Sequence, residues 1–221
     1  MNATDPVAHV RESIRDIVSD RGADLVSAYY DEDNGFAGDM FDTFGANPYD
    51  RFTSDDLIAA SLLDVRFGPT AIRDLLVNGQ ANHLLEKVPS TPESTLWNTE
   101  LQPESAAWKL WEHLTNIEGI GRTRASKLMA RKRPHLMPIL DSVIVDKLGL
   151  GRRAQWKTLA AALDDETRIA IDRLQEAVAG STPSTLRLLD VATWMRHSQS
   201  RRAKAVRARL GFPVGVSRLS L

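Results

Sequence analysis

Residues Leu114–Arg133 read LTNIEGIGRTRASKLMARKR and contain the clearest structural signal in the chain. An amphipathic helix is expected to end at the turn 117–121, and a basic helix to begin directly after it. Gly119 and Gly121 permit a tight turn, because glycine tolerates backbone geometry that a side chain obstructs. We expect Ile120 to be buried between the helices. The free N–H groups at the start of the second helix then face outward, where they favour an anion.

The second helix carries a row of cations. Arg124, Lys127 and Arg131 follow at i, i+3 and i+7, which places them on one face of a helix. Residues 119–140 contain no acidic side chain. The opposite face is expected to be buried and consists of Ala125, Leu128 and Met129. The row of cations predicts contacts with phosphate groups.

The turn 117–121, IEGIG, follows the pattern h-x-G-h-G, in which h is a hydrophobic residue and x is any residue. Together with its basic helix it resembles the helix-hairpin-helix motif that binds the DNA backbone in many repair proteins. The motif is expected at about 104–132. The resemblance implies DNA contacts by Gly119, Ile120, Gly121, Arg122, Thr123, Arg124, Lys127 and Arg131.

A longer resemblance is to the helix-hairpin-helix DNA glycosylase superfamily. Residues 131–144, RKRPHLMPILDSVI, are similar to the basic helix, Pro-containing loop and helix-opening aspartate that follow the hairpin in that superfamily. Asp141 lies twenty residues after Gly121, as the catalytic aspartate of the superfamily does. Residues 111–149 also resemble an uncharacterised bacterial protein family of unknown function. The resemblance covers about 40 residues, so the expected fold is a reduced form of the glycosylase core.

The resemblance implies that Asp141 is catalytic, since a carboxylate stabilises the positive charge that builds on the sugar during base excision. The alternative is that Asp141 only caps the helix that follows it. Thr123 occupies the position of the lysine that forms a Schiff base in lyase-competent members, so an active enzyme would be monofunctional. Lys127 is expected to face the DNA and not to replace that lysine. The iron–sulfur cluster of some members is excluded, because the chain has no cysteine.

The rest of the chain predicts an all-α protein. Apolar residues recur at helical spacing, and no strand pattern is found. The expected helices cover about 6–30, 53–65, 70–79, 80–88, 103–116, 122–132, 141–149, 152–163, 165–179, 184–197 and 200–211. Residues 31–51, rich in Gly, Asp and Asn, are expected to form a long acidic loop. We divide the chain into an N-terminal helix with this loop (1–52), a helix-hairpin-helix core (53–198) and a basic tail (199–221).

The net charge of −1 conceals a division along the chain. Residues 1–65 hold 14 acids and 4 bases, a net of −10, whereas residues 66–221 hold 15 acids and 24 bases, a net of +9. Such asymmetry indicates that the basic part meets an anion, often nucleic acid. Alternatively, the acidic stretch 31–56 pairs with the basic tail, covers the basic helix, or drives self-association.

Several classes of site are not expected. The five histidines are scattered without metal-binding spacing, the acidic loop lacks the ligand pattern of an EF-hand, and no nucleotide-binding motif is present. We therefore expect no cofactor and no metal. Trp108 and Trp111 lie three residues apart and are expected to pack in the core against one neighbour. The N-terminus does not resemble a signal peptide and no apolar run is long enough for a membrane helix, so a cytoplasmic location is expected.

The sequence thus predicts a protein that binds the DNA backbone without sequence specificity. The first alternative is a monofunctional DNA glycosylase that uses Asp141. The second is a protein-interaction module with no role in nucleic-acid binding.

Overall fold

The structure, a computed structural model, describes residues 5–19 and 21–212. Over that part of the chain it is all-helical, which confirms the predicted fold class. The α-helices are α1 (Pro6–Ser19), α2 (Gly22–Tyr30), α3 (Ser54–Ser61), α4 (Pro69–Leu76), α5 (Gln80–Leu85), α6 (Ala106–Asn116), α7 (Arg122–Lys132), α8 (Ser142–Lys147), α9 (Gln155–Ala162), α10 (Asp165–Asp172), α11 (Thr185–His197) and α12 (Arg201–Arg209). Short 3-10 helices are η1 (Glu32–Asn34), η2 (Ala37–Asp42) and η3 (Arg173–Ala177).

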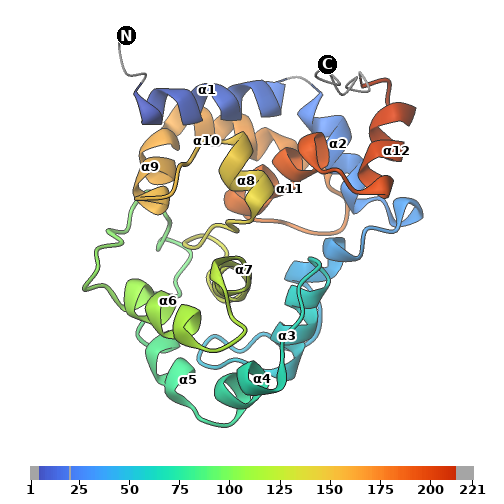
Figure 1. Ribbon diagram of the computed structural model, residues 1–221. Coiled ribbons are helices and arrows are strands. Elements are labelled where there is room, and N and C mark those ends of the chain that lie inside the picture. Colours follow the sequence, from blue (N-terminus) through green and yellow to red (C-terminus); the bar gives the residue numbers. More distant parts are fainter. Residues whose placement is uncertain (1–4, 20, 213–221) are drawn as a thin grey trace, which may run out of the picture.

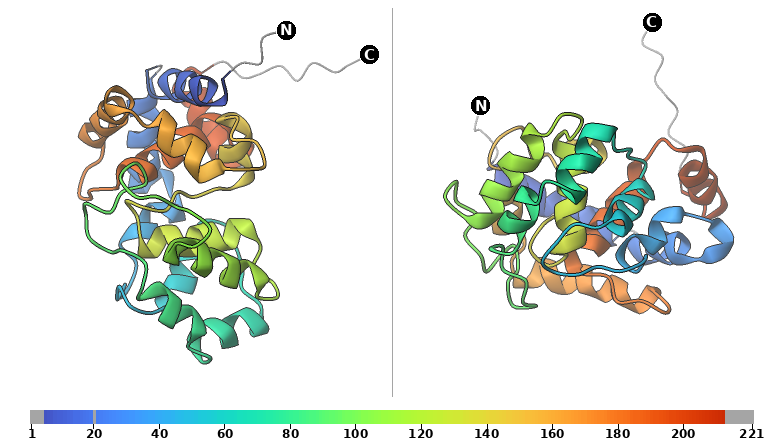
Figure 2. Two further views of the ribbon diagram at one scale, coloured as in Figure 1. Left: turned by 90° about the vertical axis from the view of Figure 1, so that its left-hand side faces the viewer. Right: turned by 90° about the horizontal axis from the view of Figure 1, so that it is seen from below.

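The helices form two lobes (Figures 1 and 2). Helices α3–α7 form the first lobe, and α1, α2 and α8–α12 form the second, which also holds both ends of the described chain. The chain passes between the lobes at residues 31–53 and again at 133–141. One hydrophobic core runs through both lobes, so neither is closed off from the other.

The α6–α7 pair confirms the packing predicted for residues 114–133. Helix α6 ends at Asn116, α7 begins at Arg122, and the two helices pack together. Ile120, between the two glycines, is only 2% exposed and reaches the core. The expected apolar face of α7 is buried and contains Ala125, Leu128 and Met129. The turn is therefore fixed from inside by an apolar side chain, as its sequence indicates.

Two segments differ from the sequence expectation. The single helix expected over 6–30 is two helices, with Arg21 in the left-handed region at φ 57° before α2. The expected loop 31–51 contains η1 and η2. It packs against the core through Phe36, and Phe41 packs in a smaller cluster with Ala59, Ala130 and Ile139. Both phenylalanines are almost fully buried, so this acidic segment is part of the folded interior despite its composition.

The described part of the chain contains no helix long and apolar enough to cross a membrane.

Candidate functional site

The turn between α6 and α7 leaves its backbone open on the outside. Gly119 has φ +82°, a conformation that L side chains rarely adopt. Gly121 has an ordinary extended backbone, φ −83° and ψ 177°, so its conformation does not require glycine. A Cβ atom at either position would meet no other atom within 4 Å. The two glycines thus leave room beside the α7 N-terminus for a ligand that approaches the backbone closely.

The predicted row of cations on α7 is not an exposed face. Arg122 is exposed and Arg124 is half-buried, but Lys127 and Arg131 are only 5% and 2% exposed. Arg124 donates its Nε hydrogen to the carbonyl oxygen of Arg66 at 2.7 Å. The expectation that Arg124, Lys127 and Arg131 together face solvent is therefore wrong. Other parts of the chain cover α7 beyond its first turn, and the phosphate contacts expected of Lys127 and Arg131 would require that cover to move.

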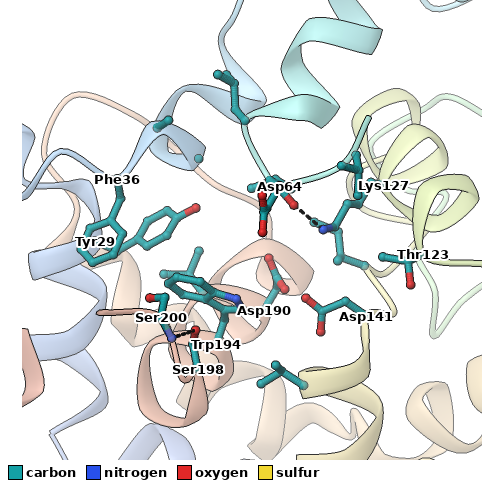
Figure 3. Close-up of a pocket in the computed structure, with 18 of the residues that line it drawn as sticks. Tyr29, Phe36, Asp64, Thr123, Lys127, Asp141, Asp190, Trp194, Ser198 and Ser200 are labelled. Carbon is teal, nitrogen blue, oxygen red and sulfur yellow. Dashed lines mark hydrogen bonds between the residues drawn. The ribbon is translucent and has the colours of Figure 1, made fainter. Parts of the chain in front are cut away.

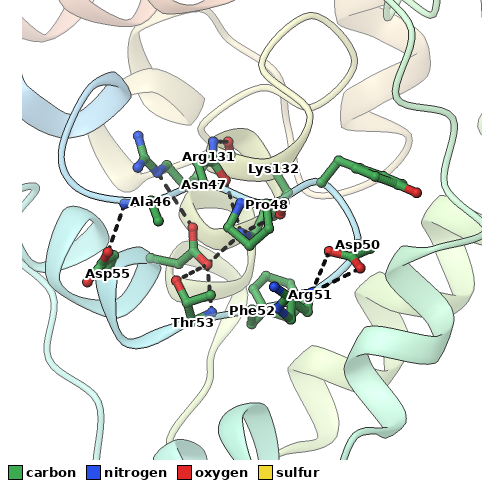
Figure 4. Close-up of polar contacts among 12 residues, drawn as sticks. Ala46, Asn47, Pro48, Asp50, Arg51, Phe52, Thr53, Asp55, Arg131 and Lys132 are labelled. Carbon is green, nitrogen blue, oxygen red and sulfur yellow. Dashed lines mark hydrogen bonds and ion pairs between the residues drawn. The ribbon is translucent and has the colours of Figure 1, made fainter.

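The segment 37–49 covers the C-terminal half of α7 (Figure 4). Arg131 donates to the carbonyl oxygens of Phe41, at 2.7 Å, and Phe44. Lys132 donates to the Asn47 side chain and the Pro48 carbonyl, both at 3.0 Å. The acidic segment does cover the basic helix, but its backbone carbonyl groups and the Asn47 side chain accept these bonds.

Two further contacts complete this cover. Arg133 donates to the carbonyl oxygens of Leu85, Val88 and Tyr49 at 2.8–3.0 Å, and burial lowers its pKa to about 10. The Asp56 carboxylate is fully buried and lies 2.5 Å from Lys132 Nζ and 3.6 Å from Arg131 Nε. These cations are structural, because each is bonded within the fold.

A cavity of about 710 Å³ lies between the two lobes, beside Asp141 (Figure 3). The first lobe contributes residues 62–65 and the α7 side chains Thr123 and Lys127. The second contributes Asp190 and Trp194 from α11, together with parts of α2, η2, α8 and α12. Its walls include the aromatic residues Tyr29, Phe36 and Trp194. The other lining residues include charged and hydroxyl side chains, and a cavity of this size is typical of a small-molecule site.

Asp141 is both a helix cap and a wall of this cavity. Its Oδ1 accepts a hydrogen bond from the Ile144 backbone N–H at 2.9 Å, so Asp141 is the N-cap of α8, as predicted. The residue is only partly buried. Figure 3 shows the carboxylates of Asp141 and Asp190 directed into the same space, with Lys127 and Thr123 on the α7 side. The cap uses one carboxylate oxygen, which leaves the second available to a molecule in the cavity.

The acidic groups here are held in unequal environments. Burial raises the pKa of Asp190 to about 6; the Arg187 guanidinium opposes this shift, and the charge of Asp141 adds to it. Arg187 pairs with Asp190 and also donates to Tyr29 Oη at 2.9 Å. Burial lowers the pKa of Lys127, an effect that the charges of Asp141 and Asp190 oppose. Two carboxylates with different environments can play different roles in acid–base chemistry.

Lys127 does not face outward. Its Nζ donates to the Leu63 carbonyl oxygen at 2.5 Å, and its side chain lines the cavity that contains Asp141. The expectation that this lysine faces the DNA stays a prediction, but its amine is buried and bonded within the fold, because residues 62–65 pass over α7 at this point. The cavity therefore contains an amine, although Thr123 stands at the position expected for it.

Sequence reasoning missed the half of the cavity that comes from the second lobe. Tyr29, Arg187, Asp190 and Trp194 come from α2 and α11, far from the hairpin in sequence. One signal was present: LRLLDVATW places a charged pair, Arg187 and Asp190, three residues apart within an otherwise apolar helix. Charged residues that are buried in such a helix must be paired, and a paired buried charge is a common feature of functional sites.

The remaining candidates lie outside this cavity. Trp108 and Trp111 both contact Trp156 edge to face, with ring centroids 5.4 and 5.2 Å apart, so the two do share one neighbour. In the basic tail, Arg209 donates to the Asn34 side chain at 2.5 Å, which brings tail and acidic segment together within one chain. Residues 213–221 of the tail, with Arg218, lie outside the described residues. Among the described residues no group of His, Asp and Glu is arranged to hold a metal ion.

Comparison with known proteins gives one family. Residues 22–197 match the family described as "Family of unknown function (DUF6308)". The chain belongs to this family. Neither the curated proteins nor the solved structures contain a match. The family match includes the α6–α7 turn and every residue that forms the cavity except those after His197.

Proposed function

We propose that this protein removes a base from DNA as a monofunctional N-glycosylase that uses Asp141. The cavity beside Asp141 carries the proposal. It is large enough for a nucleobase, has aromatic walls, and opens between the lobes next to the α7 N-terminus. An enzyme that acts on a base within a duplex must rotate that base into such a pocket.

The chemistry follows from the carboxylate. As the bond between base and sugar breaks, its electron pair leaves with the base and positive charge develops on the sugar. The Asp141 carboxylate stabilises that charge, and its cap bond to Ile144 N holds it in one orientation. Water then adds to the sugar carbon, and the proton that it gives up passes to the departing base, so the products are a sugar hydroxyl and a neutral free base. Asp190 supplies a second carboxyl group in the same cavity, with a pKa near 6.

The α6–α7 turn would hold the DNA backbone. Gly119 and Gly121 leave open space beside the α7 N-terminus, and Arg122 is exposed there. Helix N-termini bind phosphate through free N–H groups and the helix dipole. Thr123 lines the cavity at the position of the lyase lysine, which supports a monofunctional reaction.

The experiment measures base release from duplexes that each contain one uracil, hypoxanthine, 3-methyladenine or 8-oxoguanine. We expect wild type to release at least one of these bases. Asp141→Asn and Asp141→Ala should both slow release by about 10²–10³-fold, because a group that stabilises developing charge contributes that much. DNA affinity should persist in both variants. The control is Asp146→Asn, which removes an exposed carboxylate from the same helix and should release base at the wild-type rate.

A second candidate is binding of the DNA backbone without catalysis, and the cap bond from Ile144 N to Asp141 favours it. An aspartate at this position has a structural role even in an inactive protein. In that case wild type should bind duplex DNA but release no base from the panel. The Asp141 variants would then differ only in stability, with Asn close to wild type and Ala about 1 kcal/mol lower. Base release by Asp141→Asn at the wild-type rate would exclude the catalytic role.

A further inference from the structure

A second cavity lies on the other side of the α7 N-terminus. Its volume is about 410 Å³, and it is lined by the indole rings of Trp108, Trp111 and Trp156. Leu140 and Arg122 line this second cavity. The residues that follow them in the sequence, Asp141 and Thr123, line the first cavity. We call the second cavity the tryptophan groove. Adjacent residues of the chain, Arg122 and Thr123 at the start of α7 and Leu140 and Asp141 before α8, thus line different cavities.

The tryptophan rings do not fill the space between them. Trp156 meets Trp108 at an interplanar angle of 85° and Trp111 at 76°. Trp111 and Trp156 are buried, whereas Trp108 is only partly buried at the groove. Edge-to-face packing leaves ring faces that do not lie against another ring of the cluster. An exposed aromatic face next to a hollow is a surface on which a planar ligand can stack.

The rim of the groove is cationic. Arg122, Arg152, Arg153 and Lys157 line it, all of them exposed, and none of its lining residues is acidic. A chain of hydrogen bonds holds the rim in place: Arg122 Nη2 donates to Gln155 Oε1 at 2.7 Å, and Gln155 Nε2 donates to the Gly151 carbonyl at 2.7 Å. The Arg122 guanidinium also lies over the Trp111 ring, 5.6 Å from its centroid. Arg122 is thus held against the aromatic cluster, and Gln155 links it to the loop that carries Arg152 and Arg153.

We propose that the tryptophan groove binds an unpaired nucleotide of a DNA strand, with the base on the indole rings and the phosphates on Arg152 and Arg153. Aromatic platforms beside cations are how proteins bind single-stranded nucleic acid without reading its sequence. Charge complementarity favours a polyanion, and the indole rings favour one that carries planar bases. The inference shares two things with the proposed function: DNA is the ligand, and Arg122 lies at both sites. It does not require Asp141 to be catalytic.

The proposed ligand predicts a preference for DNA that has unpaired bases. The test compares a labelled oligo(dT) with an oligomer of equal length made of abasic residues, which has the same phosphates but no bases. Both are titrated by fluorescence anisotropy at one salt concentration, because affinity for phosphates depends on salt. We expect oligo(dT) to bind about tenfold or more tightly, the contribution of one or two stacked bases. Equal affinity for the two oligomers would overturn the proposal.

Two variants test whether the oligomers bind at the tryptophan groove. Trp108→Leu should reduce the ratio of the two affinities to below about threefold, because it removes the exposed ring. Arg152→Ala/Arg153→Ala should weaken both oligomers and flatten the salt slope by about 1.4 units of log K per log salt, the value for two phosphates of a single strand. The control Lys87→Ala/Arg173→Ala also removes two exposed cations, but neither of them lines the groove, and it should leave both measurements unchanged.

Tryptophan fluorescence gives an independent readout. It is measured in Trp194→Phe protein, so that the signal does not report the cavity beside Asp141. Quenching by oligo(dT), but not by the abasic oligomer, is the expected result. A full affinity ratio in Trp108→Leu would overturn the proposal, and so would a protein dimer that dissociates in that variant, since a second copy would then cover the groove. Base release by a protein that fails these tests would leave the proposed function intact.

Discussion

Asp56 lies beneath the C-terminal half of α7, where two cations converge on it. It is fully buried, 2.5 Å from Lys132 Nζ, and its Oδ2 accepts the Thr53 backbone N–H at 2.7 Å. Removal of one partner from a buried ion pair is costly, because the remaining charge keeps its desolvation penalty and loses its partner. The stability of this region therefore depends on a single carboxylate.

We expect Asp56→Ala to lower the free energy of unfolding by about 3–5 kcal/mol. Asp56→Asn should cost less, because an amide oxygen still accepts a hydrogen bond. Urea unfolding followed by circular dichroism measures both. Asp16→Ala on α1, which removes an exposed carboxylate, is the control and should stay within about 0.5 kcal/mol of wild type. A loss below 1 kcal/mol in Asp56→Ala would show that the buried cations do not need this partner.

Lys127 decides whether the proposed enzyme also cleaves the strand. Schiff-base formation needs a free amine, but Lys127 Nζ donates a hydrogen bond to the Leu63 carbonyl oxygen. We expect borohydride to trap no covalent complex between wild type and DNA that contains an abasic site. Strand cleavage should appear only after alkali treatment. The control is Lys127→Met. A complex trapped by wild type and absent from this variant would make Lys127 a nucleophile and the enzyme bifunctional.

At the scale of elements, the segment 37–49 acts as a cover for α7. Its carbonyl groups accept bonds from Arg131, Lys132 and Arg133, and its Phe41 is only 1% exposed. The sequence alone suggests that removal of residues 31–50 raises DNA affinity by uncovering a basic surface. The contacts indicate instead that removal takes hydrogen-bond acceptors from three buried cations, although Asp56, Leu85 and Val88 still pair with them. A buried polar group that loses its hydrogen-bond partner destabilises a fold.

We therefore expect deletion of residues 37–49 to abolish cooperative thermal unfolding, as measured by circular dichroism and calorimetry. The matched control, Glu32→Gln/Asp33→Asn, keeps residues 37–49 and neutralises two exposed carboxylates of η1. This variant should unfold cooperatively like wild type. A deletion variant that melts cooperatively and binds DNA more tightly would restore the interpretation of this segment as a displaceable acidic cover.

His197, the last residue of α11, makes the stability of the second lobe depend on pH. Burial, together with the charges of Lys147, Arg196 and Arg207, lowers its pKa to about 4, whereas a histidine in an unfolded chain titrates near 6.5. Between these values the unfolded chain takes up a proton that the folded protein does not. Stability must therefore fall as the pH falls from 6.5 towards 4.

We expect wild type to lose about 1 kcal/mol more than His197→Gln between pH 7 and pH 5, a value that allows for the partial exposure of the ring. Urea unfolding at the two pH values measures the difference. The control is His135→Gln, which replaces an exposed histidine and should keep the wild-type pH dependence. If His197→Gln shows that same dependence, another group is responsible.

The contrast between α7 and the turn before it shows how far the sequence can be interpreted. The glycine spacing around Ile120 and the capping role of Asp141 are local properties, so the chain reveals both directly. Helical spacing also identifies which α7 side chains share a face, but it does not reveal what lies against that face. The partners of Arg131 are 87 and 90 residues away, in a segment without periodicity. Composition predicted a loop for residues 31–51, and the structure shows that it packs through the buried Phe36 and Phe41.

At the scale of the molecule, the division of charge along the chain is not a division in space. The acidic first third contributes α1 and α2 to one lobe and α3 to the other. Arg209 of α12 contacts Asn34, and the Arg202 guanidinium lies over the Phe36 ring, so the basic tail meets the acidic segment. Exposed cations that line the cavity beside Asp141 are Arg201 and Arg202 of the second lobe, whereas Arg122, next to Thr123 in the sequence, lines the tryptophan groove.

DNA that delivers a base into this cavity must lie across both lobes, with phosphates near Arg201 and Arg202 in the second lobe and near the α7 N-terminus in the first. Each phosphate neutralised on duplex DNA adds about 0.9 to the slope of log K against log salt. Arg201→Ala/Arg202→Ala should therefore flatten that slope by about 2 units and weaken binding equally for all sequences. Gel-shift titrations at several salt concentrations measure this, with Lys87→Ala/Arg173→Ala as the charge-matched control. An unchanged slope in the Arg201/Arg202 variant would confine the DNA to the hairpin lobe, and a base could not then reach Asp141 by the proposed route.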